Sequence, residues 1–176
     1  MKKLILLWVM GMLLYSCNQN EEHIVVGPKD LHAVVDKVTE IMIHDIFSPP
    51  VASRIFAYPN IAAYEIVAQN NPEYISLAGQ VTDLKPVPAM DTVSGVNVNL
   101  AAIIAHMSIS KQLIFSEDKF EVLQDSLENN WKTVNEEEFE VSKAYGLKVA
   151  DHIKEWMGKD NYSQTRTMPQ FTVEIE

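Results

Sequence analysis

The sequence predicts an all-α protein, a helical bundle of about five helices with almost no sheet. Apolar residues recur at helical spacing in five windows of the chain, so each window has a side that can be buried. Three residues that favour the start of a helix, Ser48, Ser116 and Asn135, stand directly before three of these windows.

The first window opens at Pro28, a residue that suits the first turn of a helix. Its apolar positions are Leu31, Val34, Val35, Val38, Met42, Ile46 and Phe47. The second window begins at Pro49, after Ser48, and its apolar positions are Val51, Ile55, Ala62 and Ile66. Pro59 lies inside it and is expected to kink or split the helix, because proline donates no backbone hydrogen bond.

Residues 70–97 show no sustained period and contain three prolines and two glycines. A loop of this length is unusual in a compact domain, so we expect it to pack on a neighbouring surface. Residues 98–113 are apolar nearly all round, which predicts a central buried helix.

The last two windows begin after polar residues that suit helix starts. Ser116 precedes a window in which the apolar side is formed by Phe120, Leu123, Leu127 and Trp131. Asn135 and Glu138 resemble a capping box at the start of the final helix, which is expected to end near Met157 and Gly158. Its apolar side is formed by Phe139, Ser142, Tyr145, Val149, Ile153 and Trp156. The helical domain is therefore expected at residues 28–158, followed by an extended tail at 159–176.

Composition excludes several classes of protein. The 176 residues are 47% hydrophobic, which is enough for one domain with a core. The formal net charge of −10 disfavours nucleic acid as a partner, because an acidic chain repels phosphate backbones. With a single cysteine, the chain forms no intrachain disulfide and no cysteine-based zinc site.

The N-terminus resembles a bacterial export signal. Lys2 and Lys3 precede an apolar run at residues 4–14, and the chain then reads Leu14-Tyr15-Ser16-Cys17, which resembles a lipobox. We predict a lipoprotein signal peptide at residues 1–16, lipid attachment at Cys17 and a tether at residues 17–27. The predicted location is the bacterial cell envelope, lipid-anchored at the outer membrane or a periplasmic face. The alternative is an ordinary secretory signal with an incidental cysteine.

The five histidines do not fall into a metal-binding pattern. His44 follows Glu40 by four residues, so the two can share one side of a helix, but the chain has neither a Glu-x-x-His pair nor a His-Glu-x-x-His motif. His106 lies in the apolar helix and is expected to be a core histidine with an internal partner. Asp151 and His152 are expected on a solvated helix surface.

Arg54 is the remaining candidate for a site. It follows Ser53 near the start of a predicted helix and can bind an anion or pair with a carboxylate. We expect a structural ion pair with Asp45 or Glu65. No catalytic, cofactor-binding or metal-binding residue is predicted in this chain.

One block of sequence is specific enough to suggest a family. The block is Ser-Pro-Pro-Val-Ala-Ser-Arg-Ile-Phe-Ala-Tyr at 48–58, followed by Ile-Ala-Ala-Tyr-Glu at 61–65. It resembles the N-terminal region of bacterial vanadium-dependent haloperoxidase-like proteins, which belong to the type 2 phosphatidic acid phosphatase superfamily. Residues 76–80, 114–119 and 159–166 support the resemblance, which spans about residues 30–170.

The resemblance implies the N-terminal part of a helical haloperoxidase- or acid-phosphatase-like fold whose active site holds an anion. Family members bind vanadate or phosphate through a lysine, two arginines, a serine, a glycine amide and two histidines. Their motifs are Lys-x6-Arg-Pro, Pro-Ser-Gly-His and Ser-Arg-x5-His-x3-Asp, and none occurs here. Asp118 stands seven residues after Lys111 in place of arginine, and Asn60 follows Ser53-Arg54 where histidine is required. We therefore expect vanadate or phosphate only together with a missing catalytic half.

Three hypotheses follow. The chain is the N-terminal portion of a haloperoxidase-like or phosphatase-like enzyme and is inactive alone, or it is a non-catalytic helical lipoprotein binding module. The third, a generic helical envelope protein with an accidental likeness, fits the block at 48–58 least well. The expected partners are a membrane, through the lipid anchor, and either a second copy of the chain or a separately encoded C-terminal half.

Overall fold

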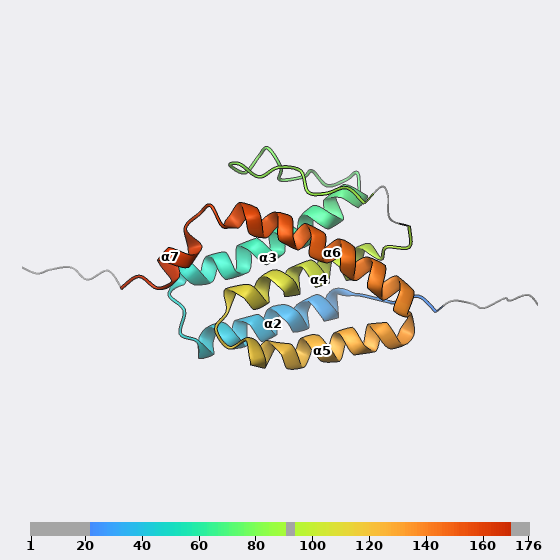
Figure 1. The fold of residues 1–176 in the computed structure, drawn as a ribbon, viewed down its shortest axis with the longest axis horizontal. Coiled ribbons are helices and arrows are strands. Elements are labelled where there is room, and N and C mark those ends of the chain that lie inside the picture. The colour runs from blue at the N-terminus through green and yellow to red at the C-terminus, as the bar shows by residue number, and fades with distance from the viewer. Residues whose placement is uncertain (1–21, 91–93, 170–176) are drawn as a thin grey trace, which may run out of the picture.

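The computed structural model describes residues 22–90 and 94–169 and confirms the predicted helical bundle (Figure 1). Its helices are α2 (Pro28–His44), α3 (Pro49–Asn70), α4 (Val98–Leu113), α5 (Glu117–Val134), α6 (Glu136–Met157) and α7 (Tyr162–Arg166). The described residues contain no strand beyond one isolated bridge between Ala78 and Val81. Helix α7 lies in the stretch that was expected to be extended, so that expectation is wrong for residues 162–166. No helix in the described ranges has both the length and the apolar composition needed to cross a bilayer.

Helix α4 is the centre of the bundle. In Figure 1 it lies between α3 and α6 on one side and α2 and α5 on the other, and it contacts all four. Eleven of its sixteen residues are buried, as the nearly uninterrupted apolar sequence predicted.

Gly146 allows α6 to approach α4 closely. A Cβ atom at this position would lie 2.5 Å from the carbonyl oxygen of Ala101 and 3.1 Å from the Cβ of Ile104. Such contacts are too short for any side chain, so the distance between the two helices depends on glycine here.

Pro59 was expected to kink or split α3, and it does not split the helix. The helix runs unbroken from Pro49 to Asn70, although the ring removes one backbone hydrogen bond. Ile55, Ala62 and Ile66 are completely buried on either side of the proline. Their packing against the core offsets the cost of about 3 kcal/mol that an interior proline carries.

The long loop after α3 packs on the bundle, as expected. Leu84 and Val87 are buried, at 3% and 4% exposed. The side-chain amide of Gln69 donates to the carbonyl of Val87 at 2.9 Å, and the indole of Trp156 donates to the carbonyl of Thr82 at 3.0 Å. The loop therefore covers α3 and α6 (Figure 1).

The residues just before α2 do not behave as the predicted tether. Ile24 and Val26 are buried, and the Glu138 carboxylate accepts a hydrogen bond from the Ile24 amide at 3.0 Å. Asn135 caps α6 by accepting from the Glu138 amide at 3.0 Å, as predicted. The Glu138 side chain, however, holds the N-terminal segment instead of closing the capping box. The signal peptide at 1–16 and Cys17 lie outside the described residues.

The end of α2 is a Schellman motif with an unusual residue in it. The amide of Phe47 donates to Met42 O at 3.3 Å, and the amide of Ile46 donates to Ile43 O at 3.4 Å. Ile46 adopts the left-handed conformation with φ of 55° and is 88% exposed. The prediction that it lies on the apolar side of α2 is therefore wrong. Glycine is the residue that favours this position, because β-branched side chains are strained there.

We predict that Ile46→Gly raises the free energy of unfolding by about 1 kcal/mol, because it relieves the left-handed strain and removes little buried surface. Ile43→Gly is the matched control. Ile43 is also exposed, at 74%, but lies in the last turn of α2, so glycine there should lower the free energy of unfolding by about 0.5–1 kcal/mol. Urea denaturation measures both values, and a loss of stability in Ile46→Gly would contradict the prediction.

Candidate functional site

Arg54 makes a structural ion pair, but not with either expected partner. Its Nε lies 3.3 Å from a carboxylate oxygen of Asp160, which also accepts a hydrogen bond from the Tyr58 hydroxyl. Burial, and then this hydrogen bond, raises the pKa of Tyr58. The prediction of Asp45 or Glu65 as the partner is therefore wrong, although the structural role is right.

Asp45 and Glu65 are engaged elsewhere, each accepting hydrogen bonds from a loop. Asp45 accepts from the amide of Ser116 at 3.0 Å and from its hydroxyl at 2.5 Å. Burial acts to raise the pKa of Asp45, but hydrogen bonds, led by that of the Ser116 hydroxyl, lower it to about 2. The fully buried Glu65 accepts from the Ser76 hydroxyl and from the Leu77 amide, both at 2.6 Å. Both carboxylates thus fasten loops to helices.

His106 is a core histidine, as predicted. It is 2% exposed, and its Nδ1 lies 3.2 Å from the Ser110 hydroxyl one turn along α4. Burial lowers the pKa of His106 to about 4, so the ring is neutral at physiological pH.

The other histidines are dispersed and do not form a metal site. Glu40 pairs with Lys37 at 2.6 Å, while His44 lies 3.1 Å from Asp45, so Glu40 and His44 do not act together. On α6, His152 is half-buried with its Nε2 3.1 Å from the Lys85 carbonyl, so it is less exposed than predicted. Within residues 22–90 and 94–169, no three histidine, cysteine, aspartate or glutamate side chains converge in a way that could hold a metal ion.

The side chains of the described residues do not fit vanadate or phosphate either. Such an anion needs several converging cationic donors and a histidine at bonding distance. Both arginines of the chain are engaged, Arg54 with Asp160 and Arg166 over the ring of Phe115 at 4.2 Å. His106 is enclosed in the core, and burial is the sole cause of its lowered pKa, with no charged neighbour contributing. The described side chains therefore do not form a vanadate or phosphate site.

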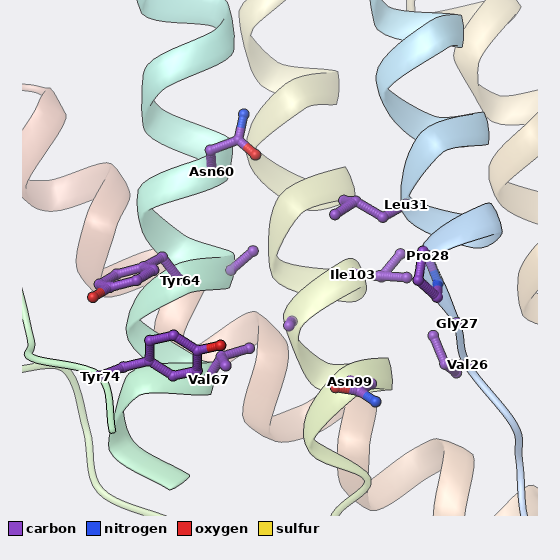
Figure 2. Close-up of a pocket in the computed structure, with 12 residues that line it drawn as sticks. Val26, Gly27, Pro28, Leu31, Asn60, Tyr64, Val67, Tyr74, Asn99 and Ile103 are labelled. Carbon is purple, nitrogen blue, oxygen red and sulfur yellow. The ribbon is translucent and has the colours of Figure 1, made fainter. Parts of the chain in front are cut away.

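An apolar groove lies over α4 (Figure 2). Helix α4 forms its floor, α3 one wall, and α2 with the residues before it the other. Figure 2 shows Tyr64 and Tyr74 at the α3 side and Leu31 at the α2 side. The groove has a volume of about 500 Å³. Its lining is Val26, Gly27, Pro28, Leu31, Asn60, Ala63, Tyr64, Val67, Tyr74, Asn99, Ala102 and Ile103.

The lining of the groove is suited to binding. None of its lining residues is charged, and none is a histidine, cysteine or serine, so the only titratable side chains in the lining are the phenols of Tyr64 and Tyr74. An apolar ligand surface is what it can accept.

Sequence reasoning did not locate this groove, because its existence depends on the gap between α2 and α3. The available signal was α4 itself: a helix apolar on all sides needs cover everywhere. Ala63 on α3 and Ala102 on α4 are small side chains that leave space at this point.

We predict that His106 makes the protein less stable in acid. Because the pKa of His106 is lowered from 6.5 to about 4 in the folded state, the unfolded chain binds the proton first as pH falls below 6.5. The contribution of the neutral ring is complete above pH 6.5 and is lost as pH falls to about 4, a loss of roughly 3 kcal/mol at 1.36 kcal/mol per pKa unit.

Urea denaturation between pH 7 and pH 4 tests this. His106→Gln should flatten the pH dependence relative to the unmodified chain, whereas His32→Gln, at an exposed position on α2, should leave it unchanged. An equal pH dependence in the unmodified chain and in His106→Gln would refute the prediction.

Comparison with known proteins finds a similar solved structure. No protein-family model and no curated protein matches this sequence. A crystal structure described as that of the first bacterial vanadium-dependent iodoperoxidase is similar, with 63% sequence identity and a TM-score of 0.83. The match covers 88% of this chain but only 37% of the iodoperoxidase chain. The chain therefore resembles part of a bacterial vanadium-dependent haloperoxidase, which confirms the resemblance found in residues 48–65.

Proposed function

We propose that this chain is the helical scaffold portion of a membrane-anchored lipoprotein related to vanadium haloperoxidases and type 2 phosphatidic acid phosphatases, and that it is inactive alone. One observation carries the proposal: 63% identity over 88% of the chain, matched to only 37% of the iodoperoxidase. The absence of all three anion-binding motifs from these 176 residues supports it. The chain supplies fold and surface, and a complementary catalytic portion supplies the anion site.

The expected inactivity has a physical cause. Removing even one preorganised donor from an oxyanion site costs roughly 10²–10³ in rate. Here the whole donor set is lacking. The histidine that bonds vanadium in family members has no counterpart, since Asn60 stands where the motif beginning with Ser53-Arg54 requires histidine.

The first test measures activity. We predict that the purified chain, given vanadate, hydrogen peroxide and iodide or bromide, oxidises no halide above the rate of buffer with the same additions. Hydrolysis of p-nitrophenyl phosphate should also stay at the background rate. An intact bacterial iodoperoxidase assayed in parallel is the positive control, and vanadate-dependent turnover by this chain alone would refute the proposal.

The second test concerns the lipid anchor. We predict that the native protein begins at a lipid-modified Cys17 and fractionates with membranes, because several acyl chains each contribute about 0.8 kcal/mol per buried CH₂ group. Mass spectrometry of the native N-terminus reads out the modification. Cys17→Ser should release the protein from the membrane fraction. An unmodified protein that retains Met1 would exclude the anchor.

The alternative function is a helical lipoprotein binding module that works without a catalytic portion, and the apolar groove favours it. The incomplete-scaffold proposal predicts self-association instead, because an uncovered apolar surface promotes it. Sedimentation separates the two: a monomer that unfolds cooperatively favours the independent module.

A further inference from the structure

The groove between α2 and α3 lies over the N-terminal half of α4. Ala102 and Ile103 on its floor are each 5% exposed, and Ala63 and Val67 on the α3 wall are half-buried. We propose that this groove is the docking site for an apolar helix of the complementary portion of a haloperoxidase-like chain. The inference rests on the proposed function and names the surface through which the two portions join.

The chemistry of the lining selects the class of occupant. Twelve residues line the groove and none carries a charge, so a phosphate, a vanadate or a charged peptide would lose its hydration without gaining a partner. The amides of Asn60 and Asn99 are exposed and supply polar groups at the rim. An apolar surface with a few polar groups at its edge matches this arrangement.

The shape selects a helix. The floor and both walls are helices, as Figure 2 shows, and a third helix laid over a gap between two others buries side chains at positions i, i+4 and i+7. The volume of about 500 Å³ accommodates a few large apolar side chains. One wall is held in place by the Tyr64 and Tyr74 rings, which meet edge to face with centroids 6.2 Å apart.

A second copy of the described domain is a poor occupant, because its helices offer no such stripe. The exposed large apolar residues on helices are single or far apart, namely Ile43 on α2, Val122 and Val134 on α5 and Leu147 on α6. No described helix therefore presents two exposed large apolar residues three or four positions apart.

The comparison points to the complementary portion instead. The iodoperoxidase has about two thirds of its chain beyond the match, while the matched part keeps 63% identity and a TM-score of 0.83. In an intact chain of that kind the matched part packs against the remainder, so part of its surface must be able to receive that remainder. We assign that contact to the groove because its lining is apolar and uncharged.

Co-expression tests the inference with the full chain. The probe is the part of the iodoperoxidase chain outside the match, carried on a second plasmid, and the readout is the amount recovered with the affinity-tagged chain. The iodoperoxidase's own matching segment, tagged in the same way, is the positive control. We expect recovery with the unmodified chain, and a loss of at least about tenfold with Ala63→Trp, which fills the groove.

Ala57→Trp is the matched control, because Ala57 lies on the same helix, is exposed and does not line the groove. It should change recovery by less than about twofold, which corresponds to about 0.4 kcal/mol. Circular dichroism of both variants checks that they fold. If Ala63→Trp does not fold, p-benzoylphenylalanine at position 63 or 57 replaces tryptophan, and photo-cross-linking to the probe should occur from position 63 only.

The outcomes are distinguishable. No recovery with the unmodified chain, while the positive control succeeds, overturns the proposed function and this inference together. Recovery that Ala63→Trp leaves unchanged, or cross-linking that is equal from both positions, overturns the docking site alone. Cross-linking from position 63 to a second copy of the chain overturns the assignment of the occupant.

Discussion

The architecture depends on the apolar circumference of α4. A helix without a polar side has no stable place except between other helices, and here α3, α6, α2 and α5 surround it. The enclosure is uneven: Gly146 brings α6 into backbone contact with α4, whereas α2 and α3 stand apart. The groove lies in a gap of this enclosure, so the packing that forms the fold also shapes the groove.

Acidic side chains complete the scaffold by securing segments that have no helical hydrogen bonds. Glu138 holds the N-terminal segment, Glu65 holds the loop after α3, and Asp45 holds the start of α5. Each accepts backbone amides that would otherwise be unsatisfied. Carboxylates used in this way serve the structure of the bundle.

Sequence reasoning succeeded where the signal was local. The bounds of α4, the N-cap at Asn135 and the buried position of His106 all follow from residues within a few positions of one another. It failed where the outcome depends on distant segments. The Ser116 hydroxyl was expected to cap α5 but binds Asp45, and Arg54 pairs with Asp160, more than a hundred residues away.

The candidate site shows the same division. The family resemblance came from a contiguous block at 48–65, so it was visible in sequence. The groove was not, because no residue pattern states how far apart two consecutive helices will lie. Ile46 differs from both cases. It is an apolar residue at helical spacing, yet it adopts the left-handed conformation, which β-branched residues disfavour.

The clamp on Ile24 has a consequence for the geometry of the protein at a membrane. Only seven residue steps separate Ile24 from Cys17, so a fully extended chain spans at most about 25 Å between them. If Cys17 carries the predicted lipid, so short a link would hold the domain close to the bilayer at the end where α4 and α6 begin, while α7 lies at the opposite end (Figure 1). Lipidation at Cys17 would then concentrate the groove within a thin layer above the membrane, where a partner anchored in the same bilayer meets it at a high effective concentration.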